Sequence, residues 1–337
     1  MSPPLGPRIA RCRIRQDTGG VTLLDFLVER FTYHTREAWL AVLAEDRVLR
    51  NGEPATGPEP LAKGDTIEYR CGDLPEPPVP HEFRVLHAED DLLVIAKPPG
   101  LPVHPAGRYF AHTLWAFLRE QGHAELHFLT RLDRETSGLL LAARTPAAAK
   151  HFQGLASRGK ITKTYLAAVE GDFPEALHAS GWLHRDAAST IRKKRRFSPL
   201  QPHVPGEQTA ETHFTCLARR QGLSLLQARL ITGRTHQIRA TLCSLGFPVV
   251  GDKIYGRDET WFLRFRDGTL TEDDRRALRL PHQALHSWRL ANQPATAMAQ
   301  QWTCPPPADF AALFPGLNSR KCNYAGNSMP KTSMIRR

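Results

Sequence analysis

Cysteine is scarce in this sequence, and no part of it is apolar over a long stretch. The cysteines are scattered without any C-x-x-C pair and are Cys12, Cys71, Cys216, Cys243, Cys304 and Cys322. This spacing argues against a disulfide framework and a structural zinc site, and it fits a reducing compartment. An apolar run of roughly 20 residues, enough to span a bilayer, is missing too. The start "MSPPLGPRIARCRIRQ" lacks the apolar segment of a signal peptide. We therefore expect a cytoplasmic protein that does not associate with membranes.

Signatures of bound nucleotides and metals are also lacking. There is no glycine-rich phosphate-binding loop and no G-x-S-x-G motif. Two histidine pairs have helical spacing, His123/His127 and His282/His286, but neither belongs to a pattern such as H-E-x-x-H that would supply a third ligand. We therefore expect no metal.

Acidic residues are outnumbered by basic ones. The chain has 45 Lys and Arg against 34 Asp and Glu, a formal net charge of +11. Five basic residues and no acid lie in 317–337, so +6 remains for the rest of the chain. A basic balance of this size favours a polyanionic partner, nucleic acid first.

Two changes in composition divide the chain. The segment "GDLPEPPVPHEF" carries four prolines, which disfavour both helix and ladder pairing and favour an extended spacer. The end "NSRKCNYAGNSMPKTSMIRR" has no periodicity and is typical of a disordered basic tail. We therefore predict a small module over 8–72, a proline-rich linker over 73–82, a large domain over 83–316 and a tail over 317–337.

The small module has a pattern of two helices and a hairpin. "GVTLLDFLVERF" and "TREAWLAVLAEDR" place apolar residues at helical spacing. Asn51-Gly52 predicts a tight turn, and 66–69 alternates like a strand. This order resembles the RNA-binding module named after a small-subunit ribosomal protein. A generic α+β appendage remains the alternative.

The large domain mixes strands with helices. Strands are predicted at 83–87, 92–96 and 161–171. A helix should begin after Thr145-Pro146, a hydroxyl cap followed by proline in the first turn, and end by Gly159. A second helix, capped by Thr235, should run to about Leu245.

The stretch "FLTRLDRETSGLLLAAR" crowds charges beside an apolar run. Arg131, Asp133, Arg134 and Glu135 precede Ser137-Gly138, which is typical of a turn. A solvated surface turn would have this composition. So would a reactive aspartate that neighbouring guanidiniums keep ionised.

Ordered motifs resolve this ambiguity. "RLDRETSGLLL", "KTYLAAVEG" and "TGRTHQIR…LGFPVVGDKIYG", preceded by "DDLLVIAKPPGLPVHPA", resemble the RNA pseudouridine synthases of the RluA type over roughly residues 83–290. The resemblance implies an α+β domain on a largely antiparallel sheet. It also implies that uridines in rRNA or tRNA are isomerised without a cofactor. Thr130 replaces the family's frequent His, and the usual F-x-H-P after "ALHSWRL" is missing.

The resemblance also implies roles for particular residues. Asp133 takes the place of the essential aspartate, Tyr165 that of the tyrosine of K-x-Y, and Arg239 that of the closing arginine of R-T-H-Q-I-R. Arg131 matches the arginine that helps to extrude the target base. The chemistry needs an ionised carboxylate, which paired arginines (Arg131 and Arg239) would maintain, and a group that helps to remove the proton from uracil C5. Attack on the ribose and elimination both remain open.

RNA contacts are expected from a wider set of cations. The run "IRKKRRF" is either a solvated loop or a phosphate-binding one, and its aromatic end and this context favour the latter. The predicted RNA-binding residues are Arg131, Arg134, Lys163, Arg192, Lys193, Lys194, Arg195, Arg196, Arg234 and His236.

Two other functions compete with this one. A catalytically silent RNA-binding or ribosome-assembly factor could use the same scaffold. A nucleic-acid hydrolase could use Asp133 with histidines and a metal. We expect an enzyme that acts on RNA, and a monomer.

Overall fold

The computed structural model describes residues 6–31, 33–72, 74–89, 91–123, 125–292 and 300–315. The predicted tail therefore lies outside the described residues. Contacts divide the chain into two compact units, Met1–Val79 with Leu101–Glu125, and Pro80–Gly100 with Leu126–Arg337. Among the described helices none is long and apolar enough to cross a membrane.

The first unit includes residues 101–125, which we had predicted to belong to the large domain. Glu76, in the proline-rich stretch, accepts hydrogen bonds from the backbone N–H groups of Phe110, Ala111 and His112 at 2.7–2.9 Å. A half-buried carboxylate that accepts three backbone hydrogen bonds fixes the segment that donates them. Residues 101–125 consequently belong with residues 1–79, while the predicted domain boundaries as such remain a prediction.

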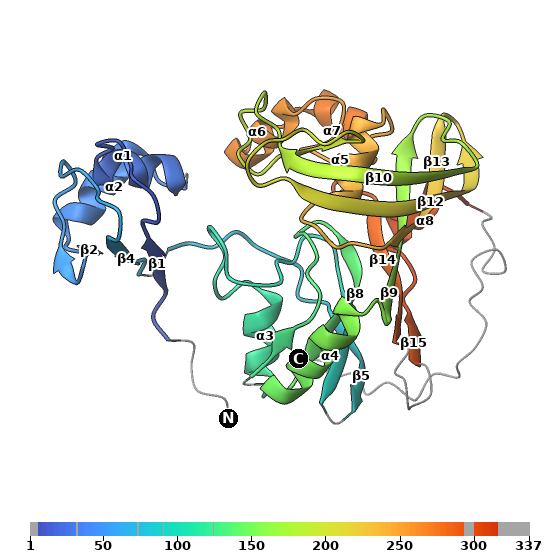
Figure 1. The fold of residues 1–337 in the computed structure, drawn as a ribbon, viewed down its shortest axis with the longest axis horizontal. Helices are drawn as coiled ribbons and strands as arrows, with labels where there is room; N and C mark the ends of the chain where they lie inside the picture. Colours follow the sequence, from blue (N-terminus) through green and yellow to red (C-terminus); the bar gives the residue numbers. More distant parts are fainter. Residues whose placement is uncertain are drawn as a thin grey trace. The chain divides into compact units, whose positions relative to one another are not determined.

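The first unit contains a small antiparallel sheet with strand order β1-β4-β2-β3 (Figure 1). Its elements are β1 (Ile9–Arg13), α1 (Leu23–Arg30), α2 (Arg36–Ala44), β2 (Val48–Arg50), β3 (Glu53–Pro54), β4 (Thr66–Arg70) and α3 (Leu114–Glu120). Thr22 and Thr35 cap the first two helices through their side chains. Asn51 and Gly52 both have positive φ, as the predicted tight turn requires. The sequence reasoning missed β1.

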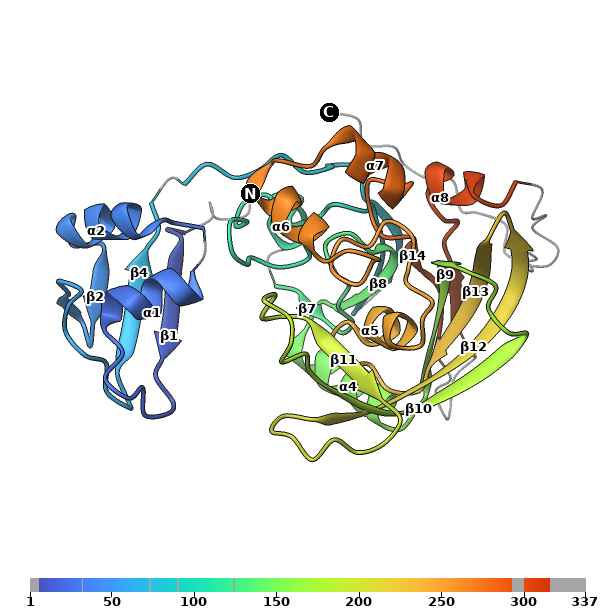
Figure 2. The same cartoon turned by 90° about the horizontal axis from the view of Figure 1, so that it is seen from above.

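The second unit is built on one large sheet (Figures 1 and 2). The described strands follow the order β11-β10-β12-β13-β9-β14-β8-β6-β5, and β15 and β7 pair with β14 and β8 respectively. All recorded pairings are antiparallel except that of β8 with β14. The strands are β5 (Arg84–Glu89), β6 (Leu92–Lys97), β7 (His127–Phe128), β8 (Ser137–Ala143), β9 (Ile161–Glu170), β10 (Ala176–Arg185), β11 (Arg195–Ser198), β12 (Gln208–Arg220), β13 (Leu223–Leu230), β14 (Leu285–Asn292) and β15 (Gln300–Thr303).

Helices cover both faces of the sheet. They are α4 (Pro146–Ser157), α5 (Gln237–Ser244), α6 (Thr260–Asp267), α7 (Glu272–Leu278) and α8 (Ala308–Ala312). α4 packs through Leu155 and Phe152 on one apolar cluster with β6 and β8. α5 contributes Ile238 and Leu242 to a larger cluster that includes β9, β12 and β13. Strands covered on both sides become apolar throughout, and all seven residues of β8 are buried.

The two predicted helix caps had different outcomes. Thr145 caps α4 through its side chain with Pro146 in the first turn, which confirms that prediction. The predicted Thr235 cap of α5 was wrong. His236 precedes the helix in a left-handed conformation without a side-chain cap, and the Gln237 side chain accepts the Arg234 N–H instead.

The predicted turn at Ser137-Gly138 was wrong as well. The turn comes earlier, where the Thr136 N–H donates to the Asp133 carbonyl, and β8 begins at Ser137. Gly138 has φ +105°, and a Cβ there would collide with the backbone of Ser287 on β14. Glycine is needed because two strands approach closely at this point.

Candidate active site

The loop before β8 carries Asp133, and hydrogen bonds from Lys97 and Gly100 hold its backbone. The Lys97 ammonium donates to the carbonyls of Pro98 and Arg134 at 2.8 and 3.0 Å. The Gly100 N–H donates to the same Arg134 carbonyl at 2.8 Å. Burial lowers the pKa of Lys97 to about 7. The backbone beside the aspartate is therefore held by donors that belong to the end of β6.

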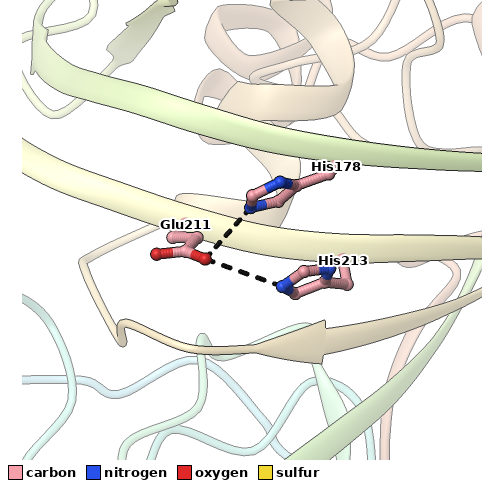
Figure 3. Close-up of side chains that lie close together, drawn as sticks. All are labelled: His178, Glu211 and His213. Atoms are coloured by element: carbon pink, nitrogen blue, oxygen red, sulfur yellow. Dashed lines mark hydrogen bonds and ion pairs between the residues drawn. The ribbon is translucent and has the colours of Figure 1, made fainter.

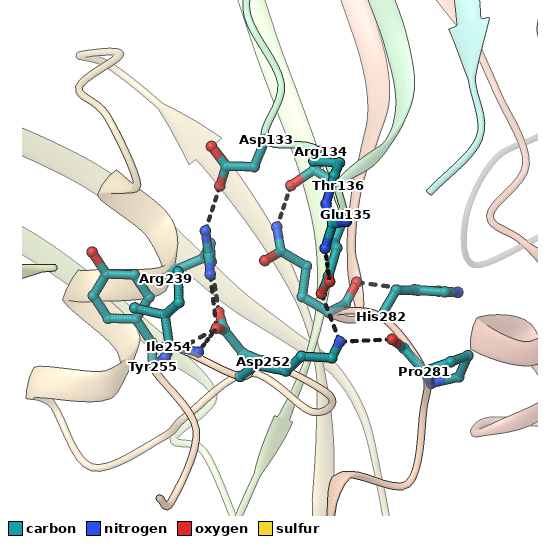
Figure 4. A network of polar contacts seen from close by, with 12 residues as sticks. Asp133, Arg134, Glu135, Thr136, Arg239, Asp252, Ile254, Tyr255, Pro281 and His282 are labelled. Atoms are coloured by element: carbon teal, nitrogen blue, oxygen red, sulfur yellow. Dashed lines mark hydrogen bonds and ion pairs between the residues drawn. The ribbon is translucent and has the colours of Figure 1, made fainter. Parts of the chain in front are cut away.

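Glu135 adds a second anchor to this loop. Its carboxylate accepts a hydrogen bond from Lys253 at 2.9 Å, and Lys253 also donates to the Pro281 carbonyl at 2.7 Å (Figure 4). Gln283 donates to the Thr136 hydroxyl from the other side. These groups surround the loop and leave the Asp133 side chain 29% exposed.

Arg239 lies between two carboxylates (Figure 4). It donates to Asp133 Oδ2 through Nη1 at 2.7 Å. It also donates to Asp252 through Nε at 2.6 Å and Nη2 at 2.7 Å. Asp252 in turn accepts the N–H groups of Ile254 and Tyr255 at 2.9 and 3.0 Å. A bidentate pair fixes the plane of the guanidinium, so its remaining nitrogen is aimed at Asp133.

The arginine controls the charge of Asp133. Burial is the largest single influence and by itself would raise the pKa of the carboxyl, but the charge and hydrogen bond of Arg239, together with His236 and a hydrogen bond from Gln283, lower the pKa to about 2. The sequence reasoning expected Arg131 to share this role. That expectation was wrong, because Arg131 is exposed and, among the described residues, no ion pair joins it to Asp133. Asp133 is thus ionised at neutral pH, and the buried Arg239 is the largest of the influences that keep it so.

His236 stands beside the same carboxylate. Its Nε2 lies 3.7 Å from Asp133 Oδ1, and its Nδ1 shares a hydrogen bond of 2.9 Å with the Tyr255 hydroxyl. Burial lowers the pKa of His236 to about 4, so the imidazole is neutral at neutral pH. The Tyr255 hydroxyl also accepts the Arg195 N–H at 2.8 Å, and its ring lies under the guanidinium of Arg239.

Tyr165 approaches the site from β9. It is buried, and it pairs in register with Ser287 of β14. Burial raises its pKa to about 12, the neighbouring Ser287 hydroxyl opposes this, and the negative charge of Asp133 adds to it. Tyr165 is therefore a neutral phenol at neutral pH, within electrostatic range of an ionised carboxylate.

Comparison with known proteins shows the family to which this chain belongs. The family described as RNA pseudouridylate synthase matches residues 91–244, a segment that contains Asp133, Tyr165 and Arg239. An uncharacterized RNA pseudouridine synthase of Synechocystis is 32% identical over 236 residues, covering 69% of this chain and 79% of that protein. This chain belongs to the RNA pseudouridine synthase family.

Two further proteins match this chain over different shares of their own length. The mitochondrial tRNA pseudouridine(32) synthase of Saccharomyces cerevisiae is 30% identical over 240 residues, which cover 71% of this chain but only 51% of the yeast protein. The structure of human RNA pseudouridylate synthase domain containing 1 superposes with a TM-score of 0.54 at 24% identity, covering 69% of this chain and 86% of that one. The predicted α+β pseudouridine synthase fold is confirmed. The ordered motifs predicted this family, and membership in it is confirmed.

Three predicted RNA-binding residues are paired internally or partly buried. Arg134 pairs with Glu135 at 2.8 Å. Arg234 donates to the Thr209 carbonyl at 3.1 Å. Lys163 is half-buried on β9, and burial lowers its pKa.

The basic run 192–196 is only partly available to a ligand. Lys194 donates to Glu259 at 2.6 Å, so the five phosphate contacts expected from sequence include one cation that is already paired. Lys193 lies over the ring of Phe262, with 4.3 Å between its Nζ and the ring centroid. Arg195 and Arg196 begin β11, and Arg196 is exposed.

Sequence reasoning missed several residues that build the synthase site. Asp252 lies in the quoted "GDKIYG", yet it received no role because nothing in a linear pattern shows that it faces Arg239. The same holds for Lys97, which lies in "KPPG". In each case a charged residue within an apolar, buried context was the available signal. His282 and His286 have separate partners, Asp309 for the first, and Ser137 and the Cys304 carbonyl for the second.

Proposed function

We propose that this synthase converts specific uridines of structured rRNA or tRNA into pseudouridine, with Asp133 as the catalytic carboxylate. One observation carries the proposal. Asp133 is ionised by a buried arginine that a second aspartate orients, and yet its own carboxylate remains 29% exposed. A carboxylate that is charged, fixed and open on one side is suited to act on a nucleotide.

The reaction breaks the bond between the ribose and uracil N1, turns the ring, and forms a bond from the ribose to C5. Asp133 acts as an anion, whether it attacks the ribose or promotes elimination, because both routes need an electron pair from an ionised carboxylate. Arg239 keeps that anion deprotonated and in place.

Tyr165 enters the reaction as a neutral phenol, because burial raises its pKa to about 12. A phenol can take up the C5 proton only if its own proton leaves at the same time. We therefore assign to Tyr165 contact with the flipped base and a concerted relay, in which the phenol passes its own proton to solvent water as its oxygen takes up the C5 proton, rather than action as a free phenolate.

The target base must leave its stack, which costs a few kcal/mol. Arg131 is exposed beside the Asp133 loop, and we propose that its guanidinium occupies the vacated place in the RNA. The exposed Arg192, Lys193 and Arg196, with Arg234, would contact phosphates. We further propose that the 8–72 module binds RNA, and that the protein acts as a cytoplasmic monomer.

RNA tritiated at uracil C5 tests the proposal. The wild-type chain should release tritium to water without shortening the RNA, and a chelator should not stop it. Asp133→Asn should abolish release while RNA binding survives, because the amide keeps the shape but not the charge. Asp172→Asn, which changes an exposed aspartate of the same unit, should behave like wild type.

Each competing function has its own outcome in this assay. A catalytically silent RNA-binding factor would bind the RNA without releasing tritium. A metal-dependent hydrolase would shorten the RNA and stop in chelator. Tritium release by Asp133→Asn at the wild-type rate would remove the aspartate from its assigned role.

A further inference from the structure

Two histidines and a glutamate that the proposed reaction does not use lie close together on the β10–β12 pair (Figure 3). In the antiparallel register His178 of β10 lies opposite His213 of β12. Glu211 precedes His213 by two residues, so both side chains point to the same face of the sheet. The strand pairing therefore places three side chains of metal-binding type on one patch.

The ligand atoms are close enough to share one ion. His178 Nε2 lies 3.0 Å and His213 Nε2 lies 3.6 Å from the same oxygen, Glu211 Oε1. All three ligand atoms lie within 4.8 Å of one another. Tetrahedral zinc with ligand bonds of about 2.0–2.1 Å needs ligand atoms roughly 3.4 Å apart. We propose that His178, Glu211 and His213 form a binding site for a zinc ion, with the fourth position taken by water.

The scaffold under this site is rigid. The Glu211 N–H donates to the Thr232 hydroxyl at 2.8 Å, and the Glu211 carbonyl accepts hydrogen bonds from Gln237 and Ile231 at 3.0 and 3.1 Å. The backbone of one ligand is thus fixed by the residues that directly follow β13 and by α5. A site on a fixed strand pair loses little freedom when the ion binds.

The side chains themselves can still adjust. The two imidazole rings are stacked, with their planes 3° apart and their centroids 4.2 Å apart. A single ion cannot lie in both ring planes, so each ring must turn slightly about its Cβ–Cγ bond. Both side chains are about half exposed, at 51% and 46%, which leaves room for that rotation.

Besides this rotation, binding requires that protons change position. A histidine nitrogen that binds zinc carries no hydrogen, so each neutral ring must hold its hydrogen on Nδ1. Glu211 then exchanges its contacts with two imidazoles for a bond to the ion. Two neutral nitrogens and one carboxylate leave one positive charge on the site, and borderline metals favour this ligand set over hard ions such as Mg²⁺.

Calorimetric titration of the full chain, with any oligohistidine tag removed, tests the proposal. Zn²⁺ should bind at one saturable site, and Mg²⁺ should not. His178→Ala, His213→Ala and Glu211→Gln should each weaken binding by more than the 10- to 100-fold that loss of an outer-shell partner typically costs. His151→Ala, which removes an exposed histidine of α4, should leave the affinity unchanged. Co²⁺ should give the visible absorption of a four-coordinate ion in wild type and lose it in the three ligand variants.

Two results would overturn this site. One is the absence of saturable Zn²⁺ binding to the wild-type chain. The other is binding of unchanged affinity in all three ligand variants, which would place the zinc elsewhere, for example at a cysteine. The circular dichroism spectrum of each variant should match that of the wild type, which checks that the variant is folded. Because no readout is a rate of RNA modification, failure of this site leaves the proposed function untouched.

Discussion

Replacing Asp252 by asparagine isolates the clamp that orients Arg239. Asp252 is fully buried, with none of its side chain exposed, and it binds the guanidinium through two hydrogen bonds. Asparagine keeps the shape but removes the charge, and its NH₂ group must face donors rather than acceptors. Loss of one partner from a buried ion pair costs about 3–5 kcal/mol, whereas an exposed pair is worth about 1 kcal/mol or less.

We therefore expect Asp252→Asn to lower the free energy of unfolding by about 3–5 kcal/mol in urea titrations. Asp267→Asn is the matched control, because Asp267 forms an ion pair with Arg266 at 2.7 Å but is 51% exposed. Its cost should stay below about 1 kcal/mol. A loss below about 1 kcal/mol for Asp252→Asn would show that the buried pair contributes no more than a surface one.

The same variant makes a prediction about pH. Burial alone would raise the pKa of Asp252, but the charge of Arg239 lowers it below the ordinary value. A carboxyl with a lowered folded-state pKa contributes stability above the unfolded value of about 3.9, and that stability is lost as the pH falls through the folded value. Because asparagine does not titrate, the gap between wild type and variant should shrink below about pH 4. If the difference in the free energy of unfolding between wild type and variant stayed constant below about pH 4, the charge of Asp252 would not be the cause of that difference.

Turnover supplies a third, independent readout. Asp252 is completely buried and cannot touch RNA, so its effect on the reaction must pass through the position of Arg239. A misplacement of about 1 Å can cost on the order of 100-fold in rate. We expect kcat for tritium release to fall by that order while KM changes little, in a variant that is still folded at the assay temperature. Wild-type kcat would refute the positioning role.

Three more predictions concern other parts of the second unit. Because Arg239 lowers the pKa of Asp133 to about 2, kcat/KM for tritium release should show no acid limb from this group near the ordinary aspartate value of about 3.9. A limb there that persists in a His236→Gln variant would contradict the lowered pKa. Gly138→Ala should destabilise the chain by more than about 1 kcal/mol, since alanine at φ +105° would also collide with β14. Unchanged thermal unfolding would show that the strands separate easily. Arg196→Gln should reduce the slope of log K against log salt for single-stranded RNA by ~0.7, while Lys194→Gln should not, because Glu259 already pairs with that lysine. Equal slopes for the two variants would mean that Arg196 makes no phosphate contact.

Local chemistry could be predicted from the sequence better than distant contacts. The Thr145-Pro146 helix start and the Asn51-Gly52 turn depend on neighbouring residues alone, and both are present. The pairing of Asp133 with Arg239 was reachable only through a resemblance, because 106 positions separate the two residues. Nothing in periodicity brings them together.

The errors have a common physical source. Arg131 was paired with Asp133 because the two are neighbours in the chain, yet neighbours in an irregular loop need not face each other. Ser137-Gly138 was assigned to a turn from its residue types, although the glycine is there to let β14 approach. His178 and Glu211 were not connected, because only the strand register brings them together. Each error involves tertiary contact, which a single sequence does not display.

β8 and β14 pair although they lie far apart along the chain, and this separation sets the order in which the parts of the site can form. His286 and Ser287 lie beside Ser137 and Gly138, about 150 positions apart along the chain. During synthesis the loop that carries Asp133 leaves the ribosome long before β14. That strand pairs with β8, which follows the loop, and with β9, which carries Tyr165. The active site can therefore close only once the last long strand has been made. A chain that stopped before residue 285 would have a sheet without the strand between β8 and β9, and Tyr165 would lack Ser287, its partner in the register.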